Sequence, residues 1–150
     1  MTSTASSKQL ALQVIEAFWE TYPPTWHGVR AHIHKTVAEE FEITGGQFHI
    51  LRRIHKGHNS VSQLADVRHT SRATISRTVD DLVRKGYISR TQNTQDRRHI
   101  TLALTEKGDQ LVEAIFSNIR DWMEARLSVC DTSELNTIIA GLDVLKKVFT

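Results

Sequence analysis

The feature that most constrains this chain is a change in the spacing of its apolar residues at Gly86. Before that glycine, apolar side chains recur at helical intervals, at Ile75, Val79, Leu82 and Val83. Residues 87–91 and 99–104 instead alternate between apolar and polar side chains, as strands do. The segment between them, residues 92–98, is polar and charged. The pattern predicts a helix followed by a two-stranded β-hairpin.

A shorter helix is predicted directly before this one. Its apolar residues are Val61, Leu64, Ala65 and Val67. Ser60 or Ser62 can cap its first turn. A link of three residues, 68–70, joins it to the longer helix, which Ser71 caps and Gly86 ends. Two helices joined so tightly and followed by a hairpin are typical of a winged helix-turn-helix.

The residues before this segment are predicted to form three helices. Apolar side chains at helical spacing predict the first over residues 8–21. The prolines at 23–24 are expected to end it, because proline has no backbone N–H and restricts the residue before it. The second is predicted over residues 25–40. The third is predicted over residues 44–57, with Phe48, Leu51 and Ile54 buried.

Two further helices are predicted after the hairpin. Thr105 caps the first, which is long, and Asp131 or Thr132 caps the second. The chain holds no internal repeat and no low-complexity segment. The predicted fold class is therefore mainly α with a small β-hairpin wing (α+β), a winged helix-turn-helix framed by N- and C-terminal helices.

The apolar stripes of the terminal helices are wider than a small central module could cover. We expect them to pack against a second copy of the chain, because two-fold dimers are the commonest soluble assemblies. This predicts dimerisation helices in residues 1–43 and 105–150, around a DNA-binding domain in residues 44–104. The alternative is a monomer whose terminal helices form a cap.

Charge is distributed unevenly along the chain. Residues 52–99 hold eleven Lys or Arg against four Asp or Glu, whereas the remainder holds eight against thirteen. A basic middle between acidic flanks is typical of a protein that binds nucleic acid. The alternative is chance clustering on a solvated surface.

Cysteine usage and the chain's start bear on the compartment. Cys130 is the single cysteine, so no intrachain disulfide forms, as is usual in a reducing cytosol. The first residues lack the basic and apolar regions of a secretory signal, and no apolar run is long enough to cross a membrane. We expect a cytoplasmic protein.

Residues 71–78, with the sequence Ser-Arg-Ala-Thr-Ile-Ser-Arg-Thr, have the composition that the DNA-reading helix of such a motif needs. Ile75 is expected to face inward. The outward side chains offer bidentate donors to guanine and hydroxyls to bases or phosphates. The predicted DNA-binding residues are Ser71, Arg72, Thr74, Ser76 and Arg77. The alternative is an ordinary surface helix with two exposed arginines.

The predicted hairpin tip carries Asp96, Arg97 and Arg98. A carboxylate beside a guanidinium can hold an arginine extended. An extended arginine suits a narrow, electronegative minor groove. We assign Arg98 to that contact, Asp96 to orienting it and Arg97 to the phosphates. The alternative is a solvated turn with a weak ion pair.

Motifs along the central segment resemble those of the MarR family of transcription regulators. The most specific are Asp96-Arg97-Arg98 and the following Leu104-Thr105-Glu106-Lys107-Gly108. The resemblance also rests on Leu64-Ala65, Ser71, Thr74-Ile75-Ser76-Arg77, Val79-Asp80, Leu82 and Lys85-Gly86-Tyr87-Ile88-Ser89-Arg90. It is close over residues 57–108, and the flanks resemble the family mainly in helix order.

This resemblance implies a homodimer that binds a pseudo-palindromic operator in double-stranded DNA. It implies a repressor released by a small aromatic or phenolic effector, in a cleft between the dimerisation helices and the DNA-binding part. The residues that could line this cleft are Trp19, Tyr22, Trp26, His34 and Phe48. An aromatic stripe at helical spacing is more often core than pocket.

Two regulatory branches of the family fit this chain less well. The peroxide-sensing branch uses a cysteine near the N-terminus, where this chain has none, and Cys130 is interpreted as a structural thiol. Some members sense zinc, so a metal-responsive regulator is the alternative function. His32 and His34, two residues apart, fall on different faces of a helix, and no ligand spacing emerges. We predict no metal site and no cofactor.

An enzyme is the competing class of function. No serine, cysteine or histidine lies in a motif with a recognisable base and orienting group. The seven glycines are scattered and form no phosphate loop. A pure protein-interaction module is a third class, which would use the apolar stripes that dimerisation already explains. The sequence favours a DNA-binding protein over both.

Overall fold

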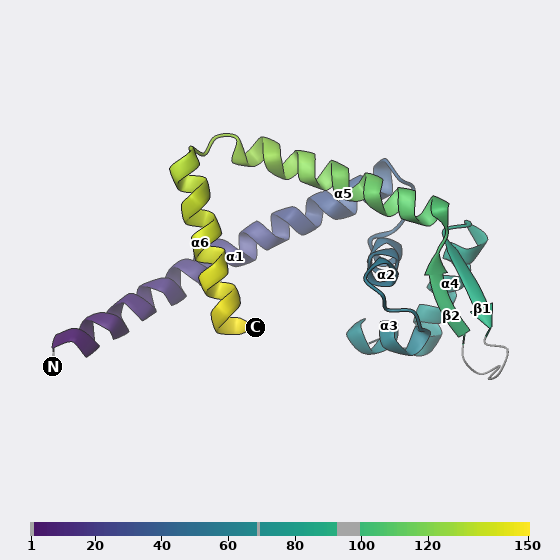
Figure 1. The fold of residues 1–150 in the computed structure, drawn as a ribbon, viewed down its shortest axis with the longest axis horizontal. Coiled ribbons are helices and arrows are strands. Elements are labelled where there is room, and N and C mark those ends of the chain that lie inside the picture. The colour runs from purple at the N-terminus through teal and green to yellow at the C-terminus, as the bar shows by residue number, and fades with distance from the viewer. Residues whose placement is uncertain (1, 69, 93–99) are drawn as a thin grey trace. The chain divides into compact units, whose positions relative to one another are not determined.

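The computed structural model of the protein describes residues 2–68, 70–92 and 100–150. Figure 1 shows a mainly helical chain with one small hairpin. The elements are α1 (Thr2–Glu39), α2 (Gly45–His55), α3 (Val61–Arg68), α4 (Arg72–Arg84), β1 (Ile88–Gln92), β2 (Ile100–Leu104), α5 (Glu106–Leu127) and α6 (Thr132–Phe149). The chain divides into two compact units, Met1–Val112 and Glu113–Thr150. The predicted fold class is confirmed.

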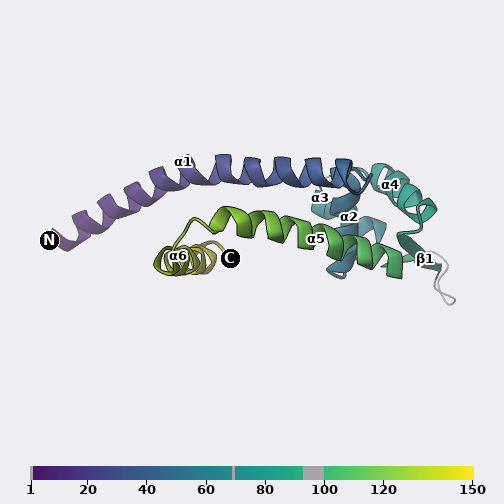
Figure 2. The same cartoon turned by 90° about the horizontal axis from the view of Figure 1, so that it is seen from above.

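The N-terminal region differs from the prediction, because α1 is one helix where two were expected. Pro23 and Pro24 lie inside it. Figure 2 shows α1 as a single, gently curved helix. Each proline removes one backbone hydrogen bond, but its fixed φ is compatible with the helical path. Helical segments on both sides continue past the two lost bonds, so the prolines interrupt the hydrogen bonding without ending the helix.

Helix α2 lies at the centre of the first unit, where it contacts α1, α4 and β2. It begins as expected at Thr44, through a capping box. The Thr44 hydroxyl accepts from the backbone N–H of Gln47 at 3.1 Å, and the Gln47 side chain accepts from the N–H of Thr44 at 2.9 Å. Gly57 follows the helix with a φ of 93°, a left-handed conformation that favours glycine. Phe48, Leu51 and Ile54 are buried, as predicted.

The hairpin packs against the helices on one face. Strands β1 and β2 are antiparallel, with Ile88 opposite Leu104 and Arg90 opposite Leu102. Both Ile88 and Leu102 are buried. The Leu102 N–H donates to the carbonyl of Asn59 at 2.8 Å, which fixes β2 to the segment before α3. The predicted strands are confirmed to within one residue over the described part of the hairpin.

The first turn of α5 is attached to the end of α4. Thr105 caps α5 by accepting from the N–H of Gly108 at 3.0 Å, and its hydroxyl donates to the carbonyl of Gly86 at 2.7 Å. Gly108 has no room for a Cβ, because the carbonyl oxygen of Tyr87 lies where that atom would be. The first turn of α5 can therefore lie this close to the backbone of Tyr87 because residue 108 is a glycine.

The second unit consists of the later part of α5 and all of α6. Asp131 starts α6 through a capping box with Glu134. No residue of α6 is buried. Most of its large apolar side chains are exposed, at Ile138, Ile139, Leu142, Val144, Val148 and Phe149.

Helix α1 also has large apolar side chains that are exposed, at Leu10, Leu12, Val14, Ile15, Trp19, Tyr22 and Trp26. Within the described residues no helix combines the length and hydropathy that a membrane span requires.

Candidate nucleic-acid interface

Helix α4 starts at a well-formed cap. Ser71 has an extended backbone, and its hydroxyl accepts from the backbone N–H of Thr74 at 3.1 Å. The two hydroxyls of Ser71 and Thr74 also lie 2.8 Å apart, within hydrogen-bonding distance. The cap satisfies one of the free N–H groups of the first turn. The other N–H groups there remain suited to a phosphate oxygen.

One face of α4 is anchored in the core and the other faces solvent. Ile75, Val79 and Leu82 are each at most 1% exposed, so the inward prediction for Ile75 is confirmed. Arg72, Thr74 and Arg77 are exposed together with Ser71, and Ser76 is half-buried. The predicted DNA-binding residues of this helix therefore lie together on a surface whose orientation the core fixes.

The arginines of α4 differ in their partners along the helix. Near the N-terminus, Arg72 and Arg77 form no ion pair with any residue that the structure describes. Near the C-terminus, Arg84 Nη2 lies 3.2 Å from Asp81 Oδ1. Among the described residues, the arginine of α4 that forms an ion pair is thus the one at the C-terminal end of the helix.

The hairpin follows α4 directly, as the wing of such a motif does. Strand β1 ends at Gln92, and strand β2 begins at Ile100. The predicted contacts at its tip, Asp96, Arg97 and Arg98, lie outside the described residues.

Two carboxylates on α4 have roles that the sequence analysis missed. Asp80 Oδ1 lies 2.6 Å from Arg90 Nη1 and so joins α4 to β1. Asp81 accepts a hydrogen bond from the side-chain amide of Gln47, which joins α4 to α2. The sequence offered one signal for these contacts. An acidic residue on a helix expected to approach DNA is unfavourable unless a nearby basic or amide side chain pairs with it.

The residues predicted for an effector site are spread over two elements. Trp19, Tyr22 and Trp26 lie along α1 and are about half exposed or more. His34 is exposed near the end of α1, and its ring packs against Gly45. Phe48 on α2 is buried in the core. The effector pocket stays a prediction.

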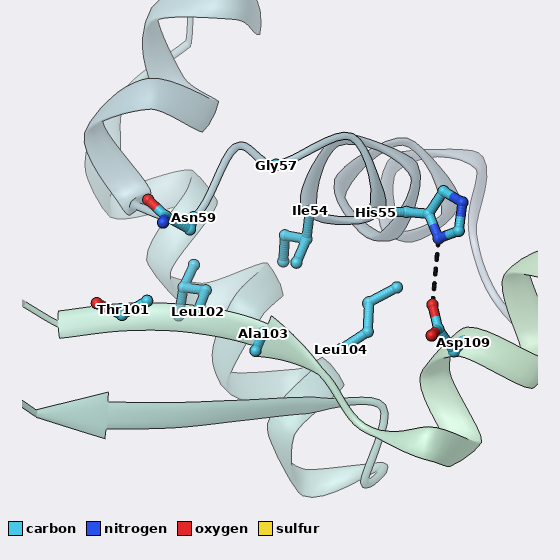
Figure 3. A pocket seen from close by; sticks show the side chains of 9 residues that line it. All are labelled: Ile54, His55, Gly57, Asn59, Thr101, Leu102, Ala103, Leu104 and Asp109. Atoms are coloured by element: carbon cyan, nitrogen blue, oxygen red, sulfur yellow. Dashed lines mark hydrogen bonds and ion pairs between the residues drawn. The ribbon is translucent and has the colours of Figure 1, made fainter.

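A shallow, open hollow of about 520 Å³ lies elsewhere in the first unit (Figure 3). His55 at the end of α2 and Asp109 in the first turn of α5 face each other there, with Nδ1 and Oδ1 3.1 Å apart. The remaining lining residues are Ile54, Gly57, Asn59, Thr101, Leu102, Ala103 and Leu104. This hollow holds none of the predicted effector residues.

The histidines do not gather into a metal site in the described part of the chain. No three His, Cys, Asp or Glu side chains come together there in a way that could hold an ion. His32 instead lies 3.3 Å from the Thr36 hydroxyl, within α1.

A capped helix after a tight turn, with a two-stranded wing behind it, defines the class: this is a winged helix-turn-helix protein. Residues 43–100 match the profile of the MarR family. A relative from Bacillus subtilis, the uncharacterized HTH-type transcriptional regulator YdcH, is 30% identical over 72% of this chain and 76% of its own length. The chain belongs to the MarR family of transcriptional regulators, which bind DNA.

Two further similarities agree with this assignment. The HTH-type transcriptional repressor MdtR of Bacillus subtilis is 32% identical over 65% of this chain and 63% of its own length. The match thus spans slightly less than two thirds of that relative. The crystal structure of transcriptional regulator Tm0710 from Thermotoga maritima superposes with a TM-score of 0.75 at 26% identity, over 89% of this chain and 94% of that one.

Proposed function

We propose that this protein is a homodimeric repressor that binds a pseudo-palindromic operator in the cytoplasm. The observation that carries the proposal is the exposed surface of α4 at Ser71, Arg72, Thr74 and Arg77, held in place by a buried apolar face. Helix α4 acts as the recognition helix and enters the major groove. A repressor role is favoured by the similarity to MdtR, itself named a repressor.

Each side chain of this surface has a role that its chemistry suggests. Arg72 and Arg77 supply bidentate donors to guanine, which discriminates between bases. Ser71, Thr74 and Ser76 supply hydroxyls to bases or phosphates. The free N–H groups at the start of α4 bind a phosphate oxygen and fix the position of the helix on the backbone.

The wing is proposed to bind the adjacent minor groove. Arg98 enters it, Asp96 orients Arg98 and Arg97 binds a phosphate. The support is the position of the hairpin strands directly after the recognition helix, together with the Asp-Arg-Arg sequence between them. These three residues form the part of the interface that reads groove width.

A second copy of the chain is proposed to cover the exposed apolar side chains of α1 and α6. Trp19 is 67% exposed and Val148 is 66% exposed in the single chain, which is costly in water. Residues 1–43 and 105–150 are then the dimerisation regions and residues 44–104 the DNA-binding domain. A two-fold axis through this interface matches the symmetry of a palindromic operator.

A small aromatic effector is proposed to release the protein from DNA. The candidate contacts are the aromatic side chains Trp19, Tyr22 and Trp26 and the exposed His34, all on α1 beside the proposed dimer interface, and Phe48, which is buried in the core. An effector acts by binding the DNA-free arrangement of the dimer more tightly than the DNA-bound one.

A footprint on the protein's own upstream region, repeated with a panel of phenolic compounds and with zinc, tests this function. The proposal predicts protection of a two-fold symmetric site that a phenolic compound abolishes. Protection that zinc abolishes instead would favour the metal-responsive alternative. Absence of sequence-preferred protection at moderate salt would contradict DNA recognition by this chain.

A further inference from the structure

The recognition helix and the wing are joined by one ion pair. Asp80 on α4 and Arg90 on β1 lie with Oδ1 and Nη1 2.6 Å apart, and their side chains are 51% and 32% exposed. A distance this short indicates a charge-assisted hydrogen bond. Arg90 is thus held beside the helix, whereas Arg72 and Arg77 in the N-terminal half of α4 form no described ion pair.

The position of Asp80 on α4 is electrostatically unfavourable for a carboxylate in a helix proposed to bind DNA. Asp80 lies in the C-terminal half of α4, away from the first turn where the helix dipole favours negative charge. It also adds negative charge to a helix proposed to approach phosphates. An ion pair this exposed adds little to stability, because water screens it. Stability alone is therefore a weak explanation for Asp80.

We propose that Asp80 is a specificity-determining residue that keeps the Arg90 guanidinium away from the DNA phosphates. The inference rests on the proposed function, because it assumes that α4 and the wing meet DNA. Phosphate contacts strengthen binding to every sequence alike, whereas base contacts distinguish sequences. By holding Arg90 against α4, Asp80 removes one sequence-independent contact and leaves recognition to Arg72 and Arg77.

This mechanism predicts what a freed Arg90 does. In Asp80→Asn the guanidinium is no longer held and binds a phosphate. One added phosphate contact raises the affinity for any duplex by roughly fivefold to tenfold near 0.1 M salt and steepens the salt dependence by about one in logarithmic slope. The operator gains less, because the wing strand also loses its attachment to α4. The ratio of operator to random-duplex affinity therefore falls.

The experiment uses the full-length protein and two duplexes of equal length, one selected by the parent from a random pool and one scrambled. Fluorescence anisotropy gives Kd for both over a range of KCl. The variants are Asp80→Asn, the double variant Asp80→Asn/Arg90→Gln, and Asp66→Asn as a charge-matched control on α3, where Asp66 is exposed. Thermal unfolding checks that each variant is folded.

The expected result is a tighter, steeper and less selective binding in Asp80→Asn, reversed in the double variant and absent from Asp66→Asn. Equal behaviour of Asp80→Asn and Asp66→Asn would overturn the inference, because a general charge effect would then suffice. So would a double variant that keeps the high affinity for scrambled duplex. If the parent selects no sequence at all, the proposed function fails first and the inference falls with it.

Discussion

The side-chain amide of Gln47 donates a hydrogen bond to the carboxylate of Asp81 and so joins α2 to α4. Gln47 is also the third residue of α2 and forms the capping box with Thr44 that starts this helix. The Gln47 side chain, which is 7% exposed, thus both caps the start of α2 and attaches α2 to α4. Asp81 in turn pairs with Arg84 and with the C-cap residue Lys85, so its charge is compensated at the end of α4.

Replacing Gln47 with alanine is expected to lower the free energy of unfolding by about 2–3 kcal/mol. The change removes the hydrogen bond to Asp81 and half of the capping box. Urea denaturation at a fixed protein concentration measures the loss. Gln110→Ala is the control, because the described partner of the Gln110 side chain is Glu106 on an exposed surface of α5. Equal stability of the two variants would argue against a structural role for the Gln47 contact.

Gly108→Ala is expected to be destabilising by about 2 kcal/mol or more. Its Cβ would meet the backbone carbonyl of Tyr87, which cannot move aside as a flexible side chain can. Gly28→Ala in α1 is the matched control, since nothing lies within 4 Å of its added Cβ. That control should be neutral or stabilising by up to about 1 kcal/mol. Comparable unfolding curves for both variants would contradict the close contact between α5 and Tyr87.

Arg77→Ala is expected to weaken operator binding roughly tenfold or more, while the unfolding temperature stays near that of the parent. The reason is that Arg77 is exposed and forms no described ion pair, so its side chain is expected to contribute to DNA binding and little to the stability of the fold. Arg84→Ala serves as the control at the other end of α4, where the arginine is paired with Asp81. Quantitative gel shifts compare the two. A larger loss for Arg84→Ala would mean that the wrong end of the helix was assigned to DNA.

Leu142→Glu is expected to convert the dimer to a monomer and to weaken operator binding with it. Leu142 is 60% exposed on α6, so its change costs the single chain little but places a charge in the proposed interface. Light scattering after size-exclusion chromatography gives the mass. Val129→Glu, outside the helices at an 86% exposed position, is the control. A parent protein that is already monomeric would refute the dimer.

Local patterns predicted most of the winged helix-turn-helix. Caps at Thr44, Ser71, Thr105 and Asp131 and the change in period after Gly86 each depend on a few neighbouring residues, and all are found where expected. The continuous α1 differs from the prediction, because Pro23 and Pro24 remove two of its hydrogen bonds without ending the helix.

The contacts between elements could not be predicted in the same way. Asp80 and Arg90 are ten residues apart and meet only because α4 and β1 pack together. Gln47 and Asp81 meet across two helices. No periodicity encodes such pairs, since each depends on the packed arrangement of the core. The surface of α4, by contrast, follows from its own spacing once Ile75, Val79 and Leu82 are buried.

The most direct test of the central claim is a hydroxyl-radical footprint of the full-length protein on the duplex it selects from a random pool. Two copies of α4 related by a two-fold axis should protect two symmetric half-sites whose centres lie about 10 base pairs, or a multiple of that, apart. Arg77→Ala should lose both protections together. A single asymmetric protected stretch, or protection that Arg77→Ala leaves intact, would contradict recognition by a pair of α4 helices.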